Sequence, residues 1–95
     1  MYIAMNQFTV VPGKGKEFEE MWKSRETFLG EVPGFKEFHL LKGENDAYIS
    51  HSTWESREAF TRWTESEAFR KAHAQGGSKG LIQGPPRFSG YEVVL

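Results

Sequence analysis

Apolar and polar residues alternate with two different periods in the first half of the chain. Residues 2–11 alternate from one position to the next and are rich in strand-forming types, which predicts a strand. Across residues 18–29 the apolar positions recur every three or four residues, which predicts an amphipathic helix of about four turns. Residues 35–42 and 47–55 predict two more strands, joined as a hairpin by Gly-Glu-Asn-Asp.

The second helical region is predicted to consist of two pieces. Ser56 is of the residue type that caps the first turn of a helix, and the apolar pattern after it predicts a short helix through Trp63. Thr64 and Glu67 have the spacing of a capping box. We therefore expect the helix to restart at Thr64 and to continue to Ala74.

The remaining residues complete a familiar order of elements. Residues 75–86, rich in Gly and Pro, predict a flexible loop, and residues 88–95 predict a final strand. The order β-α-β-β-α-β, without an internal linker, predicts a single domain over residues 1–95. Its fold class is expected to be α+β and ferredoxin-like, with both helices on one face of a four-stranded antiparallel sheet.

The first strand has apolar side chains on both of its faces. Alternate positions place Ile3, Met5 and Val11 on one face and Ala4, Phe8 and Val10 on the other. A sheet that is apolar on both sides needs cover on both sides, and the helices cover only one. The sequence therefore predicts a homodimer in which a second copy covers the other face.

Composition and charge exclude several classes of function. The chain has 95 residues, with 12 basic and 13 acidic side chains and a formal net charge of -1. This balance argues against a nucleic-acid partner or a membrane-surface patch. The absence of cysteine excludes disulfides and thiolate chemistry. The first residues have neither a basic lead nor a long apolar run, so a cytoplasmic protein without a membrane span is expected.

Three residues occupy positions at which an ordinary apolar residue would allow the chain to fold equally well: Asn6, Trp63 and His73. Each has a structural explanation: an amide bonded to a nearby loop or to water, an indole packed on the sheet, and an imidazole at the carbonyl end of a helix. Each also has a functional one, as a polar group or a neutral imidazole facing a pocket. His39 and His51 are expected to be exposed or packed, and their spacing to His73 predicts no metal cluster.

Taken together, these residues resemble a known family. Asn6, FTRW ending at Trp63 and FRKAH ending at His73 are similar to the Asn, Trp and His of IsdG-type haem-degrading monooxygenases. These enzymes belong to the antibiotic biosynthesis monooxygenase superfamily of dimeric α/β barrels. The whole segment TWESREAFTRWTESEAFRKAH resembles that family's helical motif. MYIAMNQFTVVPGKGKEFEEMW and VPGFKEFHLL resemble the opening β-α-β of the superfamily more generally.

The resemblance implies a role for each of the three residues. His73 is implied to be the proximal ligand of the haem iron, with its other ring nitrogen held by an oxygen acceptor. Asn6 is implied to donate a hydrogen bond on the opposite side of the haem, near the place where oxygen binds. Trp63 is implied to press on the porphyrin and distort it, so that a meso carbon is oxidised, the ring opens and iron is released.

Other contacts and partners follow from the same resemblance. Haem is implied to be both cofactor and substrate, and the O2-dependent reaction needs electrons from a reductase or a small reductant. Apolar residues are expected to line the haem cavity: Phe8, Phe60 and Phe69. Basic residues are expected to meet the haem propionates: Arg70, with Lys71 or Lys79.

Two other functions are compatible with the same residues. A cofactor-independent monooxygenase that oxidises an aromatic, polyketide-like substrate needs no iron ligand at His73. A non-catalytic dimer that binds haem or another hydrophobic ligand needs no turnover at all. Haem binding that depends on His73, followed by haem loss with a reductant, distinguishes the three possibilities.

Overall fold

The computed structural model describes residues 1–24, 29–74 and 80–95, with only the backbone for residues 72–74. The elements follow one another in the predicted order β-α-β-β-α-β, with the second helix in two pieces. Their bounds are β1 Tyr2–Thr9, α1 Gly15–Ser24, the short 3-10 helix η1 Leu29–Glu31, β2 Phe35–Lys42, β3 Ala47–Trp54, α2 Arg57–Thr64, α3 Glu67–Ala74 and β4 Arg87–Glu92.

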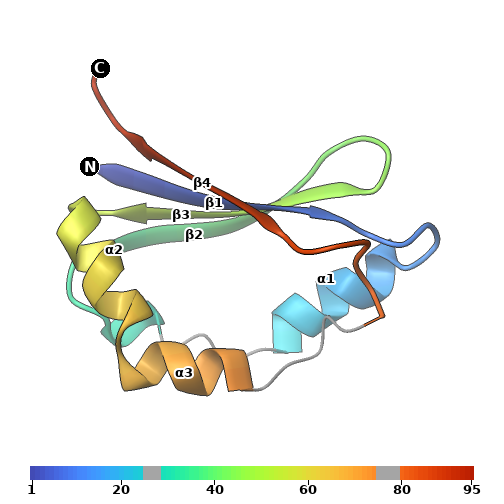
Figure 1. Ribbon diagram of the computed structural model, residues 1–95, viewed down its shortest axis with the longest axis horizontal. Helices are drawn as coiled ribbons and strands as arrows, with labels where there is room; N and C mark the ends of the chain where they lie inside the picture. Colours follow the sequence, from blue (N-terminus) through green and yellow to red (C-terminus); the bar gives the residue numbers. More distant parts are fainter. Residues whose placement is uncertain (25–28, 75–79) are drawn as a thin grey trace.

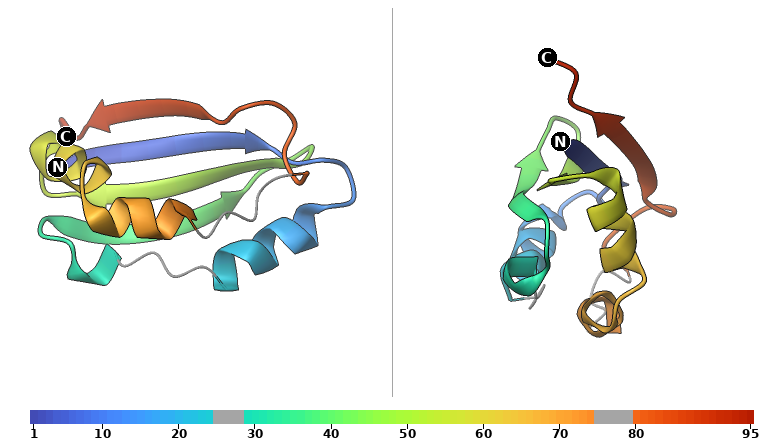
Figure 2. Two further views of the ribbon diagram at one scale, coloured as in Figure 1. Left: turned by 60° about the horizontal axis from the view of Figure 1, so that its bottom comes forward. Right: turned by 90° about the vertical axis from the view of Figure 1, so that its left-hand side faces the viewer.

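The four strands form one antiparallel sheet in the order β2-β3-β1-β4. Figure 1 shows all the helices on the same side of this sheet, with α1 near one end and α2 near the other. The additional views in Figure 2 agree with this arrangement, since the opposite sheet face carries no helix. The ferredoxin-like prediction is therefore confirmed. None of the described helices is long and apolar enough to cross a membrane.

The core between helices and sheet consists of two hydrophobic clusters. The cluster under α2, here called the α2 cluster, is built on the buried residues Tyr2, Ala4, Leu29, Trp54 and Ala59. The cluster under α1, the α1 cluster, is built on Phe8, Val10, Phe18 and Tyr48. Both clusters draw on the same face of β1, and they are separated along that strand by Asn6. Aromatic rings dominate both, which allows a short chain to bury much apolar area.

A close approach at Gly34 places α2 against the turn that leads into β2. Gly34 has a φ of +86°, and a Cβ built on it would lie 2.5 Å from the Cβ of Ala59. Its carbonyl oxygen accepts a hydrogen bond from the backbone N–H of Glu55 at 2.7 Å. Only glycine combines this backbone conformation with such a short contact. The turn therefore determines how closely the start of α2 approaches the sheet.

The first helix differs from its prediction at the C-terminal end. The α-helix ends at Ser24, whose hydroxyl donates a hydrogen bond to the carbonyl oxygen of Met21 at 3.0 Å. Residues 25–28, which the prediction included in the helix, lie outside the described residues. Leu29 belongs to η1 and is 5% exposed within the α2 cluster. Its apolar position was thus correctly identified as core, but its local structure is a 3-10 turn.

The break in the second helix was predicted correctly, but the residue that caps the restart was not. Ser56 caps α2 as expected, accepting a hydrogen bond from the backbone N–H of Ala59. The cap of α3 is Ser66, whose hydroxyl oxygen accepts from the N–H of Phe69 at 3.2 Å. Thr64 is the last residue of α2, and its hydroxyl donates to the carbonyl oxygen of Thr61. Ser caps helices at least as well as Thr, and the capping-box spacing from Thr64 to Glu67 was therefore a misleading signal for the restart.

The C-terminal segment was also predicted with the wrong extent. The final strand covers Arg87–Glu92 instead of residues 88–95, and Glu92 pairs with Tyr2, the first residue of β1. Part of the predicted loop is ordered against the other end of β1. Ile82 forms an isolated bridge with Val10, and the backbone N–H of Val11 donates to the carbonyl oxygen of Leu81. Leu81 and Ile82 thereby cover the α1 cluster.

Candidate functional site

Asn6 lies on the helix-facing side of β1, at the boundary between the two clusters. The flanking residues on the same face, Ala4 and Phe8, are 4% and 8% exposed, whereas Asn6 is only half-buried. Ser50 is its partner in β3 and Phe88 its partner in β4. Among the described residues, none forms a hydrogen bond with the Asn6 side chain. The amide is therefore available to a ligand on the helix side of the sheet.

Trp63 lies in the last turn of α2, within a group of aromatic rings. Its ring centroid is 5.3 Å from that of Trp54 and 4.8 Å from that of Phe69, which it meets edge to face. Trp54 is fully buried, whereas Trp63 is half-buried at the margin of the α2 cluster. The indole therefore packs on the core on one side and retains accessible surface on another. Packing and ligand contact are compatible at this position.

A second aromatic pair lies next to Asn6. Phe60 of α2 stacks on Phe88 of β4 with ring centroids 5.6 Å apart and an interplanar angle of 11°. Phe88 is 53% exposed although its register places it on the helix-facing side of the sheet. Its ring thus offers an accessible apolar surface directly beside the Asn6 amide. Sequence reasoning missed Phe88, and the strand pairing that brings it beside Asn6 is the signal that would have found it.

The other predicted lining residues are distributed over both clusters. Phe69, at the start of α3, joins the aromatic group through Trp63. Phe8 belongs to the α1 cluster, where its ring centroid lies 5.3 Å from that of Phe18, and it contributes chiefly to the core. Arg70 is exposed on α3, one residue after Phe69. The structure therefore brings Phe60 and Phe69 together around Trp63 and keeps Phe8 on the other side of Asn6.

His73 is located by its backbone alone. It is the penultimate residue of α3, the helix that begins after the Ser66 cap and continues from the Trp63 turn. The structure does not describe the side chain of His73, and Lys79 of the following segment lies outside the described residues. The predicted ligand role of His73 and the predicted salt bridge of Lys79 therefore stay predictions.

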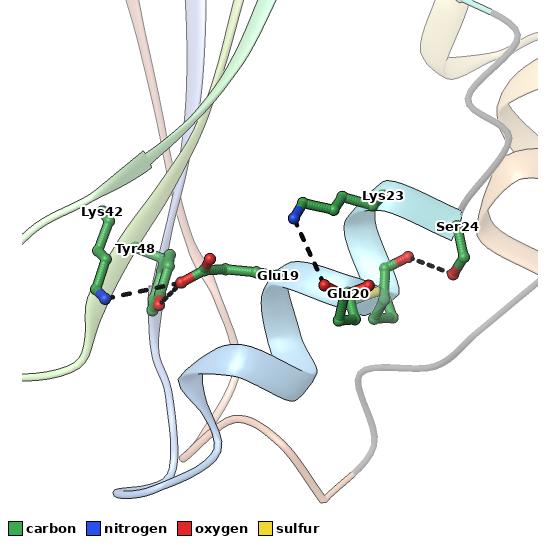
Figure 3. A network of polar contacts seen from close by, with 7 residues as sticks. Glu19, Glu20, Lys23, Ser24, Lys42 and Tyr48 are labelled. Carbon is green, nitrogen blue, oxygen red and sulfur yellow. Dashed lines mark hydrogen bonds and ion pairs between the residues drawn. The ribbon is translucent and has the colours of Figure 1, made fainter.

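A separate polar network borders α1 and the edge strand β2 (Figure 3). The Tyr48 hydroxyl donates a 2.6 Å hydrogen bond to the Glu19 carboxylate, and Lys42 Nζ lies 3.8 Å from the same carboxylate. This bond and burial raise the pKa of Tyr48 to about 12. The same hydrogen bond, followed by the nearby lysines, lowers the pKa of Glu19. A groove of about 340 Å³ runs alongside this network, lined by Glu19, Trp22, Lys23, Phe38, Leu40, Lys42 and Tyr48.

This groove is distinct from the surroundings of Asn6. Trp22 forms its inner wall, stacked on Phe38 at a centroid distance of 5.5 Å. The same indole meets Phe8 edge to face, so it also belongs to the α1 cluster. The Tyr48–Glu19 hydrogen bond ties α1 to β3 across the cluster. We assign the network a structural role in holding α1 against the sheet.

Comparison with known proteins places the chain in a family. The family model for antibiotic biosynthesis monooxygenases matches residues 1–75, which is most of the chain. The chain belongs to the antibiotic biosynthesis monooxygenase family.

Relatives of this chain differ in the chemistry that their names describe. The mycobilin-producing haem oxygenase of Mycobacterium tuberculosis is 34% identical over 96 residues, covering 98% of this chain and 89% of the relative. A solved structure of the haem degrader MhuD from the same organism has two haems bound in its active site. It is 33% identical to this chain, with a TM-score of 0.79, and the match covers 100% of this chain and 97% of that one. SnoaB of Streptomyces nogalater is a cofactor-independent oxygenase. Its structure matches with a TM-score of 0.74 at 24% identity, covering 99% of this chain and 93% of that one.

These comparisons confirm the predicted family and its fold. The haem oxygenase relatives span nearly the whole chain, including the segment that contains Trp63 and His73. The likeness to SnoaB, at lower identity, bears on the fold alone. The chain is therefore an antibiotic biosynthesis monooxygenase family member that is similar to the IsdG-type haem oxygenases.

Proposed function

We propose that this chain is a haem-degrading monooxygenase that uses Asn6, Trp63 and His73. The observation that carries the proposal is the half-buried Asn6 amide, which lies between two aromatic clusters and has no hydrogen-bond partner among the described residues. An amide that only filled space in a strand would be replaced by Val or Ile at lower cost. Its position beside accessible aromatic rings suits a large planar ligand with a polar centre.

The residues around Asn6 fit haem in their chemistry. Trp63 and the stacked pair Phe60 and Phe88 offer apolar ring surfaces, as a porphyrin face requires. Arg70 is exposed on α3, and its guanidinium is suited to a propionate. The 34% identity to a haem oxygenase over nearly the whole chain supports the same assignment. Together they favour haem over a smaller aromatic substrate.

Each residue would have a defined task. His73 would ligate the iron through a ring nitrogen from the end of α3, with the other nitrogen directed to an oxygen acceptor. The Asn6 amide would donate a hydrogen bond from the sheet, on the side of the haem opposite His73. Trp63, held by Trp54 and Phe69, would supply a rigid ring against the porphyrin. Haem itself supplies the iron that activates oxygen, with electrons from a separate reductase or small reductant.

A haemin titration tests the binding step. Haemin added to the purified apoprotein is expected to produce a stoichiometric Soret band that His73→Ala abolishes. His39→Ala is the matched control, because His39 is exposed on the other face of the sheet and is expected to leave the band unchanged. A protein without a Soret band would instead favour a cofactor-independent oxygenase. Equal binding by His73→Ala would remove the proposed ligand.

A turnover assay tests the reaction. Haem-loaded protein is expected to lose its Soret band and to release iron after addition of a reductant under air, with catalase present. Catalase is needed because free peroxide destroys haem without an enzyme. Stable haem under these conditions would contradict degradation and would favour a binding or sensing dimer.

We also propose that the chain functions as a homodimer through the uncovered sheet face. That face carries apolar residues on several strands, including Leu41 and Tyr91, which are 43% and 54% exposed. Ile3 and Met5 lie between them on β1, half-buried. Exposed apolar side chains on a sheet face that no helix covers favour association with a second copy. Sedimentation is expected to give the mass of a dimer, and a monomer at micromolar concentration would contradict the proposal.

A further inference from the structure

Two serines of β3 face the helices, and hydrogen bonds within the chain explain only one of them. Ser50 and Ser52 are two residues apart, so both side chains lie on the same face as the buried Trp54. The Ser52 hydroxyl accepts a hydrogen bond from Trp54 Nε1 at 2.9 Å and donates one to the carbonyl oxygen of Ala4 at 3.4 Å. Ser52 therefore has a structural role.

Ser50 has no such role. It is 7% exposed, and none of the described residues forms a hydrogen bond with its hydroxyl. Its strand lies in the interior of the sheet, between β2 and β1. Apolar residues are the usual choice at a buried position of this kind, whereas serine is mostly found exposed. A buried hydroxyl without a partner also costs stability, so packing within the chain does not explain Ser50.

The strand register places Ser50 directly beside Asn6. The two residues are partners in the pairing of β1 with β3. The Cβ atoms of direct partners on one face lie about 4.5–5.5 Å apart. The two side chains nevertheless form no hydrogen bond with each other or with another described residue. A small group that lies over both residues could therefore accept a hydrogen bond from each of them.

The row across the sheet that contains this pair has polar residues in the middle and apolar residues at its ends. Leu40 of β2 is the other partner of Ser50, and Phe88 of β4 is the other partner of Asn6. The row lies on the side of the sheet that the helices cover. A second copy of the chain on the opposite face would therefore leave it unchanged. The arrangement suits an apolar ligand with a polar centre.

We propose that Ser50 is a second hydrogen-bond donor of the haem site and acts with Asn6 on the same small ligand of the haem iron. This inference rests on the proposed function. A serine hydroxyl can donate one hydrogen bond, and an asparagine amide can donate two. Preorganised donors directed at one position stabilise negative charge there. The pair would thus favour small ligands that accept hydrogen bonds over ligands that do not.

Fluoride binding to the ferric haem-loaded protein tests the second donor. Fluoride is a compact anion that accepts hydrogen bonds and donates none, and a titration at constant pH can be followed in the visible spectrum. Ser50→Ala is expected to weaken fluoride binding by about tenfold, as the loss of one hydrogen bond to an anion does. Carbon monoxide, a weak acceptor, is the matched probe for the ferrous protein, and its affinity is expected to stay the same.

Ser52→Ala is the matched control, since Ser52 lies on the same strand and face but has partners within the chain. Its haem complex is expected to bind fluoride like the wild type. The melting temperature of haem-free Ser52→Ala is expected to fall by about 4–8 °C, because the buried Trp54 Nε1 loses its partner. Haem-free Ser50→Ala is expected to melt no lower than the wild type, since no hydrogen bond within the described part of the chain is lost.

The possible outcomes separate this inference from the proposed function. A wild-type protein that binds no haemin would overturn both. If haem binds but fluoride affinity is equal in Ser50→Ala and wild type, the role of Ser50 is refuted while the haem function stands. Equal losses of fluoride and carbon monoxide affinity would indicate altered access to the iron and would also refute the hydrogen bond. A melting temperature of Ser50→Ala as low as that of Ser52→Ala would make Ser50 structural.

Discussion

Replacing Asn6 by Val is expected to stabilise the protein while impairing its function. The change converts a half-buried amide into a β-branched apolar side chain between Ala4 and Phe8, both nearly buried. Because no described residue forms a hydrogen bond with the amide, no intramolecular hydrogen bond is lost within that part of the chain. The substitution therefore separates a structural role of Asn6 from a role toward a ligand.

The size of the stabilisation follows from the burial. Complete burial of a Val side chain contributes about 1.5–3 kcal/mol, so a half-buried one contributes about 1 kcal/mol. The better strand preference of Val acts in the same direction. A gain of about 1 kcal/mol in the free energy of unfolding raises the melting temperature of a domain of this size by about 4–8 °C.

Urea unfolding followed by tryptophan fluorescence measures the stability, and the rate of haem loss with reductant measures function. Gln7→Val, on the next residue of β1 and facing the other side of the sheet, controls for strand preference alone. The haem of Asn6→Val is expected to bind normally but to decay about 100-fold more slowly, as when one preorganised hydrogen-bond donor is removed. A loss of 1 kcal/mol or more in stability would show that the amide is structural. Full activity would remove Asn6 from the proposed site.

Three further changes test the fold and its polar contacts. Gly34→Ala is expected to lower the free energy of unfolding by about 2–3 kcal/mol in urea titrations, because a positive φ and the contact with Ala59 are both incompatible with a Cβ. Unchanged stability of this variant would contradict the close approach of α2 to the turn. Tyr48→Phe is expected to cost about 1 kcal/mol at pH 7. Folding raises the pKa of Tyr48 from 10.0 to about 12, so the protonated hydroxyl stabilises the fold below pH 10 and this stabilisation disappears as the pH rises to 12. If the difference in the free energy of unfolding between wild type and Tyr48→Phe stayed constant from pH 9 to 12, the hydrogen bond to Glu19 would be refuted. Ser66→Ala is expected to cost about 1 kcal/mol in thermal unfolding, as the loss of an N-cap does, with Ser66→Thr as the conservative control; equal stability of the two variants would be inconsistent with the cap.

The sequence predicted most of the elements because local signals agreed with the tertiary structure. Strands 35–42 and 47–55 were located almost exactly, since both lie in a hairpin with a polar turn and alternate regularly. The Ser56 cap and the break before α3 were also correct. The parity of β1 correctly grouped Asn6 with Ala4 and Phe8, whose burial identifies the helix-facing side.

The remaining features depend on contacts between distant segments. Ser66 and Thr64 are both acceptable caps, and in the structure Ser66 caps α3 whereas Thr64 bonds back to Thr61 at the end of α2. The proximity of Phe88 to Asn6, and of His39 to His51, is set by strand register, which no local pattern encodes. Sequence reasoning could therefore name the residues of the candidate site but could not identify their neighbours.

Iron release from haem-loaded protein is the most direct test of the proposed function. Wild-type protein loaded with one haem per chain is mixed with a reductant under air, with catalase and a chromophoric iron chelator present. The Soret band is predicted to disappear, and the chelator is predicted to capture iron in proportion to the haem consumed. His73→Ala is predicted to do neither, and His39→Ala is predicted to match the wild type. Haem that stays intact in the wild-type protein, with no iron captured, would contradict the account.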